Sequence, residues 1–266
     1  MTGAGGTVKA KAGMAIKTEA STKVNIFVKE TNDAGRHKFS QSLTLPENVD
    51  KFGKVIGTLT LGPTPKGLDP WDRLASLALF DESGRRFELV RCITPYRKSW
   101  TWTTDLTHML PLLKGKKTFT WECETWGEGW LISFDLDYFE GGIKQRPFQV
   151  MPLWQGTFEI GTGKTPPQPV SLDLPKVKRA EVYTTVTGHG MHPNTDNAAE
   201  FFPLWRRLGA NGKETQNLLW FEECYLNPCR PQGGTWKYDR AGWAPGSVPS
   251  PWVVDVTKDL KPKSNF

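Results

Sequence analysis

The sequence predicts an all-β fold built from sandwiches or jelly rolls. Short segments in which apolar and polar residues alternate recur along the chain, as half-buried strands require. The 26 Gly and 20 Pro supply turns between these segments, and no long amphipathic helix pattern occurs. A chain of 266 residues is too long for one ordinary sandwich and suits two domains.

The first half of the chain contains several strand-like segments and the turns that join them. Residues 24–28 and 38–45 alternate as half-buried strands do. Residues 74–80 and 87–93 flank the sequence DESGRR, which predicts a hairpin with Gly84 at its turn.

Two further features follow in the first half. Residues 117–124 and 130–138 flank the sequence TWGEG, which predicts a second hairpin. A short helix or turn is expected at 106–113, where Asp105 could cap its beginning.

Gly141 and the glycine after it, followed by KQRP, mark a natural domain boundary. We therefore expect a mobile N-terminal arm at 1–23, an N-terminal domain at 24–141 and a C-terminal domain at 142–266.

The clearer strands of the C-terminal domain are expected at 180–187, 217–224 and 252–256. The Asn-Gly pair at 211–212 is a hairpin signal.

The charge pattern bears on the class of partner. The net charge is +6, and the basic residues are scattered except at the two lysine-rich tails. Scattered charge indicates a solvated surface rather than a nucleic-acid site, while attraction to acidic glycans stays open. No apolar run approaches the length of a membrane span, so no membrane partner is expected. Residues 1–23 lack the apolar core of a signal peptide, so the compartment stays open.

The four cysteines fall into two groups. Cys92 and Cys123 lie in apolar strand-like segments and are expected to be small core residues. Cys224 and Cys229 bracket the loop-like sequence YLNP and could form a short disulfide or stay free thiols. No zinc site is expected, because neither a second cysteine pair nor a nearby His completes one.

The segment PQGGTWKYDRAGWAPG at 231–246 is dense in Gly, Pro and Trp. Gly and Pro allow turns and close backbone approach. Trp236, Tyr238 and Trp243, packed around Arg240 and the Asp before it, would form an aromatic wall with charged tips. Such a wall suits a sugar, whose C–H faces stack on rings while its hydroxyls bind charges.

Trp71, Asp72 and Arg73 place an aromatic ring, a carboxylate and a guanidinium just before a predicted strand. This group could line a ligand site. The alternative is a structural Asp–Arg ion pair at a loop end.

Glu122 and Glu124 share one face of a predicted strand, and Trp126 follows at the turn. This pattern fits either a binding site or a solvent-facing strand edge.

Glu200 stands between alanines and the two phenylalanines Phe201 and Phe202. Burial there would raise the pKa of its carboxyl and suit it to donate or shuttle a proton. The alternative is an exposed Glu at the beginning of a strand.

The sequence TGHGMH offers His189, Met191 and His192 as metal ligands. The chain has four His, and the other two stand in unrelated sequence contexts. A glycine-rich bend is therefore the expected role, with no metal.

Taken together, the motifs resemble those of the peptide-N-glycosidase F family, bacterial amidases that remove intact N-glycans from asparagine. The motifs occur in the family's order: WDR at 71–73, ITPY at 93–96, ETW at 124–126, AE at 199–200, and DRAGW with PG within 239–246. Each motif alone is weak, but five in order at compatible spacing are a specific signal.

The resemblance implies two packed antiparallel jelly-roll sandwiches of eight strands each. It implies that Asp72 is the principal catalytic carboxylate, that Glu200 is the second essential acid, and that Glu124 binds the inner sugars and supports Asp72. Residues implied to line the sugar site are Trp71, Arg73, Trp126, Phe201, Arg240 and Trp243. The implied partners are N-glycosylated peptides or proteins, with no metal or organic cofactor.

The chain departs from the family pattern at several positions. Ala198, Phe202 and Ala244 replace family cysteines, and Phe201 replaces a Trp. The family is secreted or periplasmic, and the missing cysteines count against such a compartment for this chain. Family members also continue beyond residue 266, which leaves open whether the second sandwich has its last strands. A monomer is expected, with self-association through an open sheet edge as the alternative.

Three other functions share features with this pattern. A glycoside hydrolase also pairs carboxylates with tryptophans, but it would leave one N-acetylglucosamine on the asparagine. A glycan-binding module would hold the chitobiose core without turnover. A copper monooxygenase shares paired jelly rolls, but the shortage of histidines counts against it.

Overall fold

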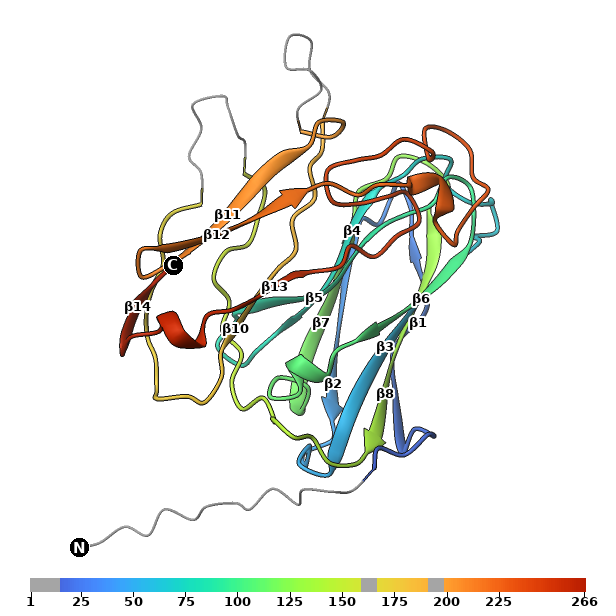
Figure 1. Cartoon of the computed structure of the whole chain (residues 1–266). Coiled ribbons are helices and arrows are strands. Elements are labelled where there is room, and N and C mark those ends of the chain that lie inside the picture. Colours follow the sequence, from blue (N-terminus) through green and yellow to red (C-terminus); the bar gives the residue numbers. More distant parts are fainter. Residues whose placement is uncertain (1–14, 159–166, 191–198) are drawn as a thin grey trace, which may run out of the picture. The chain divides into compact units, whose positions relative to one another are not determined.

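The computed structural model describes residues 15–158, 167–190 and 199–266 (Figure 1). Within these ranges, strands and three short 3-10 helices make up the regular structure. The expected all-β fold class is confirmed. Figure 1 shows the strands grouped into sheets joined by long loops.

The first eight strands form a jelly roll of two four-stranded sheets. The sheet orders are β1-β8-β3-β6 and β2-β7-β4-β5. Most successive strands therefore change sheet, which is the jelly-roll connection. The strands are β1 (Thr22–Asn32), β2 (Lys38–Leu45), β3 (Phe52–Gly62), β4 (Leu74–Phe80), β5 (Arg86–Ile93), β6 (Trp100–Asp105), β7 (Gly115–Cys123) and β8 (Trp130–Glu140).

This topology corrects one sequence expectation and confirms another. The hairpin expected between β7 and β8 is wrong, because β7 pairs with β2 and β4 while β8 pairs with β1 and β3. Proximity in sequence suggested a hairpin, but burying both apolar faces places the two strands in different sheets. The β4–β5 hairpin is confirmed, and its turn residue Gly84 has a positive φ of 78°.

The core of the jelly roll follows from strand alternation. Residues along β3 and β8 alternate between buried and half-buried, so one face of each strand lies in the core. The largest buried side chains include Trp121, Trp130, Tyr138 and Phe134. Burial of each such ring contributes about 1.5–3 kcal/mol, so these rings fix the sheet packing.

The helix or turn expected near 106–113 is present as a 3-10 helix, Thr107–Met109. The cap expected at Asp105 is wrong, because the N-cap is Leu106, which makes no side-chain cap hydrogen bond. The Asp105 carboxylate accepts from the Thr107 amide at 2.9 Å, which is the local hydrogen bond of an Asx turn just before the helix.

The C-terminal strands form two-stranded sheets: β10 with β13, β11 with β12, and β14 with β9. Their bounds are β9 (Ser171–Asp173), β10 (Glu181–Thr184), β11 (Leu204–Ala210), β12 (Lys213–Leu219), β13 (Trp252–Asp255) and β14 (Lys263–Asn265). The expected hairpin at 211–212 joins β11 to β12. Asn211 and Gly212 have φ values of 50° and 89°, which suit its two-residue turn. Val182, Leu208, Ala210 and Val256 form the small core.

Two compact units divide the described residues. The first contains the residues up to Leu68 together with Ser76–Val90 and Ser99–Met151. The second contains Asp69–Ala75, Arg91–Lys98 and the residues from Pro152 on. The domain limits at 23, 141 and 142 stay predictions. The second unit therefore takes the WDR and ITPY motifs from the first half of the chain.

All four cysteines are buried free thiols. Cys92 and Cys123 are core residues, as expected. The disulfide alternative for the other pair is absent. Cys224 Sγ instead lies 3.7 Å from the carbonyl oxygen of Trp243. Burial raises the pKa of Cys224 and of Cys229 to about 11, so both stay protonated at neutral pH.

Candidate active site

The loop that carries Asp72 is fixed by two buried polar residues. The Asp69 carboxylate accepts a hydrogen bond from the Trp71 amide at 3.0 Å and lies 3.6 Å from Arg73 Nε. The Thr94 hydroxyl accepts from the Arg73 amide at 2.7 Å and donates to the Trp71 carbonyl at 3.2 Å. Asp69 and Thr94 have no exposed surface. The backbone on both sides of Asp72 is therefore held in place.

Arg240 is the buried centre of the second unit's polar cluster. Its side chain has no exposed surface, and three of its nitrogens donate hydrogen bonds. Nε donates to Glu200 Oε1 at 3.3 Å, Nη1 to the Tyr238 carbonyl at 2.6 Å, and Nη2 to Thr235 Oγ1 at 2.7 Å. A buried guanidinium requires such partners, because losing its hydration is otherwise very costly.

Aromatic rings enclose the Arg240 guanidinium. Its central carbon lies 4.9 Å from the Phe201 ring centroid and 4.8 Å from the Trp243 ring centroid. Both contacts are within cation–π range. Trp243 stacks in turn on His189 at 4.9 Å and donates from its indole nitrogen to the Gly188 carbonyl at 2.6 Å.

Glu200 is held through both its backbone and its side chain. Its carbonyl accepts from the Ala241 amide at 2.9 Å, and its Oε2 accepts from the Gly190 amide at 3.3 Å. The segment containing Gly188 packs tightly against the turn containing Ala199, because a Cβ at Gly188 would lie 1.8 Å from the Ala199 carbonyl oxygen. Glycine is therefore required at 188 for the segments to approach.

Burial has the largest effect on the Asp72 carboxyl. Burial raises the pKa of its carboxyl, and this effect exceeds the opposing effects of a hydrogen bond from Tyr96 and of the charges of Arg240 and Arg73. Burial likewise raises the pKa of the Tyr96 hydroxyl to about 12, so Tyr96 stays a hydrogen-bond donor.

Glu200 has a similar environment. Burial raises the pKa of its carboxyl, against the Gly190 amide and Arg240, and the negative charge of Asp72 raises it further. The raised pKa expected for Glu200 is confirmed, and the pKa of Asp72 is raised as well. The effect of the Asp72 charge on Glu200 also indicates that the two carboxyls are near each other.

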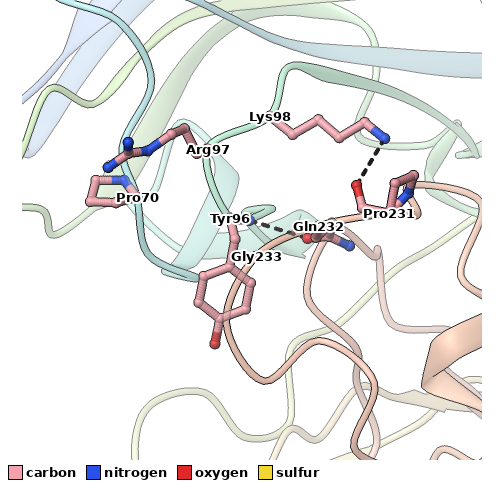
Figure 2. Close-up of a pocket in the computed structure, with 7 residues that line it drawn as sticks. All are labelled: Pro70, Tyr96, Arg97, Lys98, Pro231, Gln232 and Gly233. Atoms are coloured by element: carbon pink, nitrogen blue, oxygen red, sulfur yellow. Dashed lines mark hydrogen bonds between the residues drawn. The ribbon is translucent and has the colours of Figure 1, made fainter.

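A hollow of about 520 Å³ opens beside Tyr96 (Figure 2). Its lining residues are Pro70, Tyr96, Arg97, Lys98, Pro231, Gln232 and Gly233. The Tyr96 amide donates to Gln232 Oε1 at 3.1 Å, and Lys98 Nζ donates to the Pro231 carbonyl at 3.3 Å. A ligand in this hollow would contact the ring of Tyr96, whose hydroxyl binds Asp72.

The structure brings five of the predicted site residues into one cluster within the second unit. Asp72, Glu200, Phe201, Arg240 and Trp243 are linked by the contacts described above. The other two predicted residues of this unit, Trp71 and Arg73, flank Asp72, and Trp71 is 58% exposed.

The members of the expected aromatic wall differ in burial. Arg240, Trp236 and Trp243 are buried, and Tyr238 is largely exposed, at 61%. The buried guanidinium of Arg240 is surrounded by rings and carbonyl oxygens. The sugar-lining roles expected for Arg240 and Trp243 stay predictions.

Glu124 and Trp126 belong to the first unit, in the exposed turn after β7. Buried Asn32 holds this turn through its side-chain amide, which donates to the Cys123 carbonyl at 3.1 Å. Gly129 closes the turn at a φ of 68°, where a Cβ would lie 1.8 Å from the Asn32 carbonyl oxygen. The roles expected for Glu124 and Trp126 stay predictions.

Sequence reasoning gave no role to Tyr96, Thr235, Asp69 or Thr94. Tyr96 and Thr94 lie in the ITPY motif and Thr235 in the run at 231–246, so both segments were recognised. Their hydrogen-bond partners are distant in sequence, so the motifs alone do not reveal these contacts.

His189 is exposed, and its ring faces Trp243. Lost hydration on that face lowers the pKa of His189 to about 4, and the charges of Arg91 and Arg240 lower it further. In the part of the chain that the structure describes, no group of three or more metal-ligating side chains occurs. Met191 and His192 lie outside the described residues.

The part of the chain that the structure describes contains no helix long and apolar enough to cross a membrane.

Comparisons with known proteins find similar sequences. The family described as "Peptide-N-glycosidase F, C terminal" matches residues 162–266. A peptide-N(4)-(N-acetyl-beta-D-glucosaminyl)asparagine amidase F from Elizabethkingia miricola is 28% identical over 284 residues, covering 95% of this chain and 78% of that protein.

Solved structures give the same result for the fold. PNGase F from Flavobacterium meningosepticum, described as a glycosylasparaginase, matches with a TM-score of 0.82 at 24% identity, over 92% of this chain and 86% of that one. PNGF-II matches with a TM-score of 0.66 at 16% identity, over 95% of this chain and 60% of that one. These matches confirm the resemblance that the ordered motifs predict: the chain is similar in sequence and fold to peptide-N-glycosidase F proteins.

Proposed function

We propose that this protein is an amidase that hydrolyses the bond between asparagine and N-acetylglucosamine and so releases intact N-glycans from glycopeptides or glycoproteins. The peptide product would carry Asp in place of the glycosylated Asn, and the sugar product would be a glycosylamine. The similarity to asparagine amidase F supports the reaction class.

One observation carries the proposal. Asp72 and Glu200 interact electrostatically, both have raised pKa values, and both interact with the buried guanidinium of Arg240. Two neighbouring carboxyls that resist ionisation, close to a fixed positive charge, suit a reaction that both removes and supplies a proton.

Amide hydrolysis needs an activated water and a proton for the leaving nitrogen. In the proposed mechanism, ionised Asp72 accepts a proton from the attacking water while Tyr96 holds its carboxylate in place. Glu200, whose raised pKa favours the acid form, delivers a proton to the nitrogen as the C–N bond breaks.

The sugar and peptide would be held by exposed groups around these acids. Trp71 is 58% exposed next to Asp72 and offers a ring face for a sugar. The hollow beside Tyr96 offers further contact area for the substrate. Glu124 and Trp126 are proposed to bind the inner sugars, as the family resemblance implies.

A single incubation with a standard N-glycopeptide tests the proposal by mass spectrometry. The amidase converts Asn to Asp and leaves no sugar on the peptide. A glycoside hydrolase would instead leave one N-acetylglucosamine on an unchanged Asn. Chitobiose binding without release during a long incubation would indicate a glycan-binding module and would contradict the proposal.

A further inference from the structure

Two hydroxyl groups connect the buried Arg240 to Asp72. Arg240 Nη2 donates to Thr235 Oγ1 at 2.7 Å, and Thr235 Oγ1 lies 3.0 Å from the Tyr96 hydroxyl oxygen. Tyr96 is hydrogen-bonded in turn to the Asp72 carboxylate. Thr235 and Tyr96 together form a hydroxyl bridge between Arg240 and Asp72.

The direction of these hydrogen bonds is determined by their ends. A guanidinium can only donate, and an ionised carboxylate can only accept. Thr235 accepts from Arg240, so its single proton is available for the Tyr96 oxygen. Tyr96 then has its own proton to donate to Asp72. Every bond in the bridge therefore runs from the positive charge toward the carboxylate, and aligned hydrogen bonds of this kind strengthen one another.

We propose that Tyr96 and Thr235 are positioning residues that keep the Asp72 carboxylate ionised and correctly oriented for its role in the reaction. This inference rests on the proposed function and adds two residues to it. Arg240 uses Nε for Glu200, Nη1 for Tyr238 and Nη2 for Thr235. Its charge therefore reaches Asp72 through space and through the hydroxyl bridge.

The ring of Tyr96 is held tightly enough for this task. Its amide donates to Gln232 Oε1 at 3.1 Å. The backbone at Gly234 passes directly over the ring, since a Cβ there would lie 2.6 Å from ring carbons Cε1 and Cζ. Tyr96 is 7% exposed, so its hydroxyl has little access to competing water.

The charged and titratable groups that face Asp72 are Tyr96, Arg240, Arg73 and Glu200. Burial opposes ionisation of Asp72, while Tyr96 and both arginines favour it. Removing the hydroxyl of Tyr96 takes away a hydrogen bond to the charged form without changing the burial. The pKa of Asp72 is then expected to rise.

The test is an NMR titration of the full chain without substrate, with ¹³C-labelled aspartate carboxyls and the Asp72 signal assigned from Asp72→Asn. Tyr96→Phe is expected to raise the pKa of Asp72, and Thr235→Val to raise it less. Thr235→Ser should retain the wild-type titration because it keeps the hydroxyl. Thr235 is exposed, so its variants are expected to fold even where Tyr96→Phe is unstable.

Activity measurements complete the test. The acid limb of the rate profile for glycopeptide should move to higher pH with the Asp72 titration. One pH unit below the new pKa, only about a tenth of the enzyme would carry the ionised carboxylate. Tyr183→Phe is the matched control, because the Tyr183 hydroxyl also donates to a carboxylate, Glu181, at 3.4 Å elsewhere in the unit.

The outcomes separate this inference from the proposed function. An unchanged Asp72 titration in folded Tyr96→Phe and Thr235→Val would overturn the hydroxyl bridge. A shifted titration in a chain that releases no glycan would support the control of Asp72 and refute the amidase proposal. A large loss of kcat in Thr235→Ser would indicate a steric role and would also overturn the inference.

Discussion

The fully buried side chain of Arg240 donates a hydrogen bond from Nε to Glu200 Oε1 at 3.3 Å, while Phe201 and Trp243 enclose its guanidinium. This pair joins two segments that are 40 residues apart in the chain. Its burial ties the stability of the second unit to the same guanidinium that interacts with the candidate catalytic acids.

Arg240→Lys is expected to destabilise the second unit by about 3 kcal/mol. A single ammonium group cannot replace the hydrogen bonds of the planar guanidinium or its contacts with the aromatic rings. Chemical denaturation followed by tryptophan fluorescence measures the change. Arg207→Lys is the matched control, because Arg207 is exposed and its ion pair with Glu214 is long, at 3.6 Å. Equal stability of the two variants would contradict a structural role for Arg240.

Asp72→Asn is expected to lower kcat for N-glycopeptide release by about 10²–10⁴-fold, the usual contribution of a general base. Asp173→Asn, on an exposed strand residue of the same unit, should leave kcat unchanged. Release at the wild-type rate by the Asp72 variant would remove Asp72 from the mechanism.

The same Asp72→Asn variant should be more stable than the wild type at neutral pH. The pKa of Asp72 is higher in the folded protein than in the unfolded chain, because burial disfavours its charge. Between the two pKa values the folded state binds more protons, so stability falls as pH rises through this window and stays lower above it. The Tm at pH 7 is expected to rise by about 2–4 °C for each kcal/mol added to the free energy of unfolding, and this gain should disappear in acid. A thermal unfolding series at several pH values measures it.

Glu200→Gln is expected to slow turnover far more than it weakens glycan binding, because the amide cannot supply the proton. The pKa of Glu200 is raised by burial, so the wild-type acid keeps its proton above the usual range and loses activity as pH rises through that pKa. This alkaline limb should be absent from the residual activity of the variant. Binding by calorimetry and rates across pH provide the two readouts, and an equal loss in both would argue for a role in binding alone.

Gly234→Ala should reduce both stability and activity. Gly234 has a φ of 60°, and a Cβ there would lie 2.6 Å from the Tyr96 ring. The unfavourable φ alone costs about 1–2 kcal/mol, and the clash must also displace the ring that binds Asp72. Gly212→Ala separates the two effects, because Gly212 has a φ of 89° and open space around it. Both variants should lose stability, measured by thermal unfolding, but Gly212→Ala should keep full activity on glycopeptide. A fully active Gly234→Ala would show that the position of Tyr96 is unimportant.

The sequence by itself determined the all-β class and most strand positions, and it singled out the candidate acids. Alternation of apolar and polar residues is a local property, so segments such as 38–45 and 74–80 could be recognised without their partners. Asp72, Glu200 and Arg240 could be selected because each stands in a short motif that resembles a known family.

The tertiary structure decided which segments meet. β7 and β8 are adjacent in the chain but lie in different sheets, because both must turn an apolar face to the same core. The hydroxyls of Tyr96 and Thr235 are 139 residues apart in sequence and 3.0 Å apart in space. Only folding surrounds the buried charge of Arg240 with Glu200, two rings and carbonyl oxygens. Burial and hydrogen-bond direction depend on neighbours that are distant in sequence, so they became visible only in the folded chain.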